Sequence, residues 1–95
     1  MIPLAQEFTF DQNLFRQVAR TGRVILLERR RTEHSKPSFE VVIVQRHPAR
    51  TIQGREYPAR ESMPPSTSWG VSGWSPIDAD AAKQKFREIV AKRRA

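Results

Sequence analysis

Apolar residues are spaced in the first half of the chain as β-strands space them. Glu7-Phe8-Thr9-Phe10 alternates polar and apolar residues and predicts a short edge strand with both phenylalanines on one face. Residues 24–27 are all aliphatic and are followed by charge, which predicts a buried strand. Residues 39–46 contain a second aliphatic run at positions 41–44. This run predicts a strand buried on both faces, either central in a sheet or covered by a helix.

The segment between the first two of these strands allows two interpretations. One is a helix capped by Asp11 and ended by Gly22. The other is a strand over residues 14–20 that turns at Thr21-Gly22 into a strand over residues 23–29. The hairpin places Phe15, Gln17 and Ala19 on one face, and Arg16, Val18 and Arg20 on the other. We favour the hairpin, although the pattern leaves the helix open.

The C-terminal segment predicts an α-helix. Ser75 is a suitable N-cap, Pro76 suits the first helical position, and Asp78 lies three residues after the cap. The apolar residues that follow have helical spacing and form one stripe: Ala82, Phe86, Ile89 and Val90. We therefore expect an α+β fold, with a small antiparallel sheet of three to five strands and one C-terminal helix packed on one face.

The region between the sheet and the helix has little periodicity. Residues 47–68 contain four prolines and several arginines and predict a long Pro/Arg-rich loop. Within it, His47-Pro48-Ala49-Arg50 is followed ten residues later by Tyr57-Pro58-Ala59-Arg60. This is either a repeat that presents a ring and an arginine twice or a coincidence of composition. Residues 1–12 are interpreted as an N-terminal arm of a single domain spanning residues 1–95.

Composition narrows the functional classes. The chain has 95 residues and a net charge of +7, with no cysteine, so disulfides and cysteine-based metal sites or nucleophiles are excluded. The N-terminus has neither the basic start nor the apolar run of a secretory signal, and no segment has the length of apolar sequence that a membrane span needs. We expect a cytoplasmic protein with no membrane partner, and a homodimer remains open for a chain this small.

Enzyme signals are weak. His34 and His47 lie on or beside predicted loops with no carboxylate arranged for a metal site or a catalytic triad. The serines lack a nucleophile-elbow context, and Glu56 and Glu61 are flanked by arginines that favour local ion pairs. No phosphate-binding or dinucleotide-binding glycine motif occurs. We therefore expect no enzymatic activity, no cofactor and no metal.

Basic and aromatic residues provide the better signal. Arginines cluster around the predicted hairpin, and lysines and arginines cluster at the C-terminus, as on a surface that binds a polyanion. Aromatic side chains near arginines suit nucleic acid, because bases stack on rings while arginines hold phosphates. The predicted nucleic-acid-binding residues are Arg16, Arg20, Arg23, Arg29, Arg30, Arg31, Arg50, Arg60, Tyr57 and Trp74.

The stretch from Trp69 to the helix resembles a known family. Trp69-Gly70-x-x-Gly73, followed by Ala82-x-x-x-Phe86 on a predicted helix, is similar to the end of a WGR domain. The resemblance implies a sheet that leads into a helix, and DNA as the ligand of known members. Trp69 and Gly70 match the motif, whereas Val71 stands where the family has the arginine that contacts nucleic acid.

These observations predict a non-catalytic protein that binds DNA or RNA through an arginine-rich sheet surface and exposed aromatics, as phage or bacterial accessory proteins do. The alternative is a small protein-interaction module, an inhibitor or adaptor, whose basic face docks an acidic protein partner.

Overall fold

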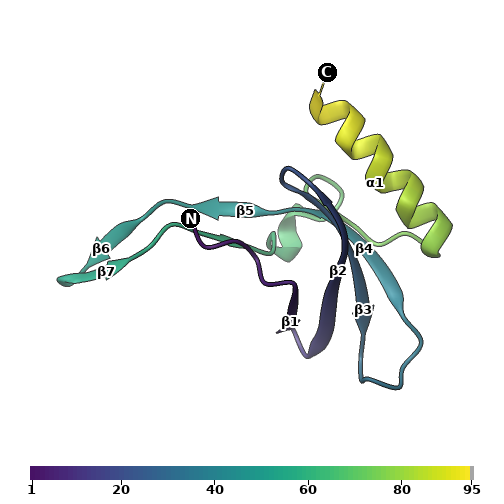
Figure 1. Ribbon diagram of the computed structural model, residues 1–95, viewed down its shortest axis with the longest axis horizontal. Coiled ribbons are helices and arrows are strands. Elements are labelled where there is room, and N and C mark those ends of the chain that lie inside the picture. Colours follow the sequence, from purple (N-terminus) through teal and green to yellow (C-terminus); the bar gives the residue numbers. More distant parts are fainter. Residues whose placement is uncertain (95) are drawn as a thin grey trace.

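The computed structural model describes residues 1–94, and its centre is a five-stranded antiparallel sheet in the order β1-β2-β3-β4-β9 (Figure 1). The sheet strands are β1 (Glu7–Phe10), β2 (Asn13–Thr21), β3 (Val24–Arg30), β4 (Ser38–Ile43) and β9 (Gly73–Trp74). The hairpin over residues 13–30 is thereby confirmed, and its register pairs Thr21 with Val24 across the turn at Gly22. The predicted α+β fold is also confirmed, with a single helix at the C-terminus of the described chain.

The aliphatic runs are buried because both faces of β3 and β4 are covered. On one face, Val24, Leu26 and Val41 pack under the helix. On the other, Ile25 and Val42 belong to a cluster that also contains Phe15, Leu27, Val44 and Met63. We call the first the helix face and the second, which no helix of the described chain covers, the open face of the sheet.

A β-bulge in β2 changes which face the hairpin arginines occupy. The pairing with β3 shifts between Gln17 and Ala19, so Val18 is the extra residue. Simple alternation predicted Arg20 on the face opposite Phe15 and Gln17, and this prediction is wrong. The bulge returns Arg20 to the open face, where it lies opposite Ile25.

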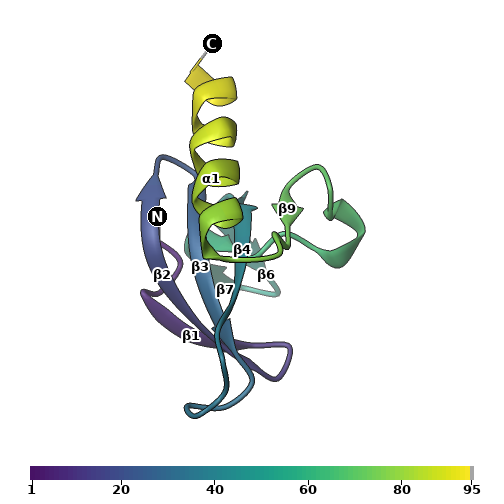
Figure 2. The same ribbon diagram turned by 90° about the vertical axis from the view of Figure 1, so that its right-hand side faces the viewer.

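Helix α1 (Ala79–Arg94) lies across β3 and β4 (Figure 2). The predicted stripe is confirmed, since Ala82 and Ile89 are buried against Val24, Leu26 and Val41, with Phe86 and Val90 beside them. The predicted start is too early. Asp78 caps the helix by accepting a hydrogen bond from the Ala81 amide at 2.8 Å, whereas the Ser75 hydroxyl accepts one from the Trp69 indole.

Residues 45–62 form a two-stranded ribbon that extends away from the sheet (Figure 1), so the predicted loop over residues 47–68 is wrong for most of its length. Strand β5 (Gln45–His47) pairs with β8 (Arg60–Ser62), and β6 (Arg50–Ile52) pairs with β7 (Arg55–Tyr57). The tip turns through Gln53 and Gly54, both with positive φ, as a type I′ hairpin requires. Residues 63–72 are irregular apart from the short 3₁₀ turn η1 (Ser66–Ser68). We call residues 45–62 the ribbon arm.

The repeated tetrapeptide has a structural role within the ribbon arm. Its two copies lie opposite each other, because His47 pairs with Arg60 and Arg50 pairs with Tyr57. Pro48-Ala49 therefore faces Pro58-Ala59 at the point where the two ladders are interrupted. Proline lacks a backbone N–H and cannot donate to a ladder, so one proline on each strand interrupts the pairing in this part of the arm.

The base of the ribbon arm is joined to the N-terminal segment. The Ile2 amide donates to the Ala59 carbonyl at 2.8 Å, and the Glu61 amide donates to the Ile2 carbonyl at 2.9 Å. Within residues 1–94, no helix is both long enough and apolar enough to cross a membrane.

Candidate nucleic-acid interface

Most of the predicted hairpin arginines are engaged within the protein. Arg16 and Arg30 both contact Glu28, at 3.1 and 2.7 Å, and hydrogen bonding from Arg30 is the main reason why the pKa of Glu28 is lowered. Arg23 donates twice to the Val44 carbonyl, at 2.9 and 3.3 Å. Because these arginines already bind groups within the protein, they are less available to a ligand than composition alone predicts.

Arg20 belongs to an ion-pair cluster around the buried Glu61, which joins the ribbon arm to the sheet. Its guanidinium donates to both carboxylate oxygens, at 2.8 and 2.6 Å. Arg46 and the Leu4 amide also donate to this carboxylate, at 3.3 and 3.1 Å. Chiefly through the hydrogen bonds from Arg20, the pKa of Glu61 falls from 4.5 to about 2.

Arg29 is paired with Glu40, and Arg31 is not paired. Arg29 donates to Glu40 Oε1 at 2.8 Å and to the Ser38 hydroxyl at 3.1 Å on the open face. Arg31 follows β3, is exposed, and makes no ion pair with any residue of the described chain. Of the six predicted hairpin arginines, it is therefore the one with a fully available charge.

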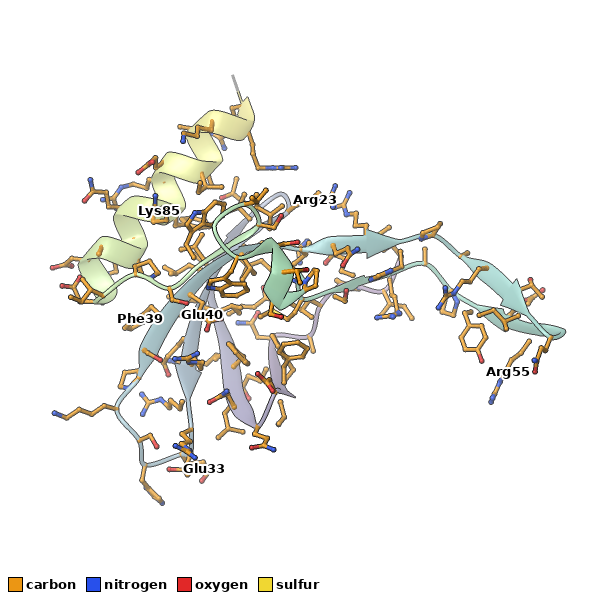
Figure 3. All side chains as sticks on the ribbon, turned by 180° about the vertical axis from the view of Figure 1, so that it is seen from behind. Arg23, Glu33, Phe39, Glu40, Arg55 and Lys85 are labelled. Atoms are coloured by element: carbon orange, nitrogen blue, oxygen red, sulfur yellow. The ribbon has the colours of Figure 1, made fainter. Side chains whose placement is uncertain are left out.

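The ribbon arm carries one group of cations that are available to a ligand. Arg50, Arg55 and Arg60 are exposed, and none of them makes an ion pair or a side-chain hydrogen bond with residues 1–94. Tyr57 is also exposed and lies directly across the ladder from Arg50. Figure 3 shows Arg55 at the far end of the arm, well away from the sheet. The prediction omitted Arg55, although its place beside the Gln53-Gly54 turn signal marked it as a residue of a hairpin tip.

A second group of exposed cations lies on α1. Lys83, Arg87, Arg93 and Arg94 are exposed on the helix, whose last turn favours positive charge through the helix dipole. Glu88 is close to two helix lysines, at 3.5 Å from Lys85 and 3.9 Å from Lys92. The helix therefore supplies a positive surface separate from the ribbon arm.

The two tryptophans occupy different environments. Trp74 is half-buried against the helix-face cluster, and Lys85 Nζ lies 6.0 Å from its ring centroid. This position leaves less of the Trp74 ring available for stacking than the sequence-based prediction assumed. Trp69 is 37% exposed, and its ring lies on Gly73 so closely that a Cβ there would be 2.5 Å from two ring atoms.

No group of three or more histidine, aspartate or glutamate side chains in residues 1–94 is arranged to hold a metal ion. His47 instead makes a 2.7 Å hydrogen bond with the Ser62 hydroxyl, across the base of the ribbon arm.

Comparison with known proteins finds no match: no protein-family model, no curated protein and no solved structure matches this chain. The resemblance of the Trp69-Gly70 stretch to the WGR family therefore stays a prediction.

Proposed function

We propose that this protein is a non-catalytic nucleic-acid-binding protein that holds the phosphate backbone along its ribbon arm. One observation carries the proposal: the arm extends from the sheet and bears three exposed arginines without a partner in the described chain. A cation without an internal partner can contact a phosphate without breaking an existing ion pair.

The shape and composition of the arm support the same function. A two-stranded β-ribbon is narrow enough to enter the major groove of DNA or to follow a single strand. The arm contains four arginines against two glutamates, and Glu61 is already bonded to Arg20 and Arg46. Tyr57 offers a ring beside Arg50, which is the combination that stacks a base and holds its phosphate.

A titration tests the proposal on the unmodified protein. Affinities for single-stranded and double-stranded oligonucleotides of one length are measured at about 50 mM and about 200 mM salt. A nucleic-acid-binding protein loses affinity steeply as salt rises, because binding releases counterions from the phosphates. Absence of binding to either form at the lower salt concentration overturns the proposal and favours the alternative, a module that docks an acidic protein.

A further inference from the structure

A second site on the open face has features that phosphate binding does not explain. A pocket of about 620 Å³ lies between the β1–β2 turn and residues 63–75, within the size range of small-ligand sites. Its lining includes Phe10, Phe15 and Trp69 together with the Arg29–Glu40 ion pair. Aromatic rings and a buried charged pair thus line one cavity, on the side of the sheet away from α1.

Glu40 is the distinctive group in this pocket. It is 4% exposed, and it lies between Phe39 and Val41 on β4, where it pairs with Leu27 of β3 (Figure 3). Its Oε1 accepts from Arg29 at 2.8 Å, whereas Oε2 accepts no hydrogen bond from residues 1–94. No fully buried side-chain oxygen in this part of the chain lacks a partner, so Oε2 retains an opening. Glu40 is also one of the residues that line the pocket.

A carboxylate buried in this way costs free energy unless N–H groups donate to it, and burial raises the pKa of Glu40 despite the nearby Arg29. A ligand with N–H donors would suit the pocket, because Glu40 Oε2 can still accept a hydrogen bond. It must also be flat, because Trp69 and Phe10 present partly exposed rings to the cavity. Arg29 retains unused N–H groups beside the carboxylate and favours an acceptor next to those donors.

We infer that the pocket binds an unpaired guanine base of the nucleic acid. Guanine is the one standard base whose Watson–Crick edge offers two adjacent N–H groups, N1–H and the 2-amino group, next to an acceptor, O6. Glu40 accepts from one donor at Oε2 and from the other at the second lone pair of Oε1, which it shares with Arg29. Arg29 donates to O6, and Trp69 or Phe10 stacks on the ring, which is how unpaired bases are commonly read. This inference rests on the proposed function, to which it adds a base preference for single strands.

The first experiment changes the ligand and leaves the protein intact. Affinities are measured by fluorescence anisotropy for oligothymidylates that carry one central guanine, hypoxanthine, adenine or cytosine. Guanine should bind about tenfold more tightly than hypoxanthine, which lacks the 2-amino group, a factor in the range of a good carboxylate–base contact. Adenine and cytosine should bind no better than hypoxanthine.

The second experiment compares two variants that remove the same charge. Glu40→Gln should abolish the guanine preference, whereas Glu56→Gln, in the exposed part of the ribbon arm, should retain it. For oligonucleotides without guanine, both variants should gain slightly in affinity, since each removes one negative charge. If Glu40→Gln does not fold, the comparison of guanine with hypoxanthine in the unmodified protein still decides the question.

The outcomes separate this inference from the proposed function. Salt-dependent binding with equal affinity for all four bases, or with a preference for cytosine, overturns the guanine site and leaves the phosphate-binding arm in place. Absence of binding to any oligonucleotide overturns both.

Discussion

The Glu61 cluster should make the stability of the protein depend on pH in a specific way. Each tenfold change in proton affinity corresponds to about 1.4 kcal/mol, so lowering the pKa of Glu61 from 4.5 to about 2 corresponds to about 3 kcal/mol of stabilisation. Glu61 is 3% exposed, whereas Arg20 and Arg46 are 26% and 44% exposed, so screening by solvent makes about 3 kcal/mol an upper bound.

The sign follows from the direction of the change in pKa. The folded protein binds the Glu61 proton more weakly than the unfolded chain does, so the stabilisation is fully present above pH 4.5 and is lost as the pH falls towards 2. Between about pH 6 and about pH 3, the loss from this one group is about 2 kcal/mol. Glu28 has a lowered pKa and contributes in the same direction, whereas the raised pKa of Glu40 contributes in the opposite direction.

Comparing variants isolates Glu61 from those other groups. The free energy of unfolding is measured by urea denaturation at both pH values for the wild type, Glu61→Gln and Glu56→Gln. Glu61→Gln should be less stable than wild type at about pH 6, because Arg20 and Arg46 lose their carboxylate, and should lose about 2 kcal/mol less on acidification. Glu56→Gln, which removes an exposed glutamate with no ion pair in the described chain, should follow the wild type. Equal losses in the wild type and Glu61→Gln would refute this account of the cluster.

Three further substitutions test the Trp69 contact and the start of the helix. Gly73→Ala should destabilise the protein by about 1–3 kcal/mol and change the tryptophan fluorescence, because the new Cβ would lie 2.5 Å from Trp69 ring atoms; an unchanged melting temperature and emission spectrum would contradict this. Asp78→Ala should lower the free energy of unfolding by about 1 kcal/mol, because it removes the hydrogen bond from the Ala81 amide. Ser75→Ala should leave the helix content, measured by circular dichroism, unchanged. A loss of stability and helix content in Ser75→Ala, with none in Asp78→Ala, would show instead that Ser75 is the N-cap.

The parts of the fold with strong local periodicity were predictable from the sequence. The aliphatic runs of β3 and β4 reflect burial on both faces of the sheet, and the helical spacing from Ala82 to Val90 reflects burial on one face of the helix. Both patterns can be recognised without the rest of the chain. The start of the helix was ambiguous, because Ser75 and Asp78 are both good caps. In the folded protein the Trp69 indole donates a hydrogen bond to the Ser75 hydroxyl, which leaves Asp78 as the cap.

The ribbon arm was not predictable in the same way. Its ladders have three residues per strand, are almost wholly exposed and are separated by prolines, so they lack the hydrophobic alternation that marks a strand. One signal was present: Gln53-Gly54 lies midway between the two repeated tetrapeptides, as the turn of a hairpin would.

Some residues of the candidate site could be predicted from the sequence, and others could not. Arg50, Arg60 and Tyr57 were predicted from charge and aromatic content. The pairing of Arg20 with Glu61, 41 residues away, follows from the bulge at Val18 and the return of the ribbon arm, neither of which has a local sequence pattern. Glu40 was overlooked. A single carboxylate beside a run of aliphatic residues in a buried strand is costly unless it is paired, so it indicates a specific interaction.

The central claim is that the ribbon arm holds phosphates, and the salt dependence of binding tests it most directly. The Arg50→Ala/Arg55→Ala/Arg60→Ala triple variant is compared with Lys83→Ala/Arg87→Ala/Arg93→Ala, which removes the same charge from the exposed face of α1. For a single-stranded oligonucleotide, three lost phosphate contacts should reduce the slope of log affinity against log salt by about 2, and this reduction should occur in the arm variant. The account would be contradicted if the arm variant kept the wild-type slope and the helix variant showed the reduced slope instead.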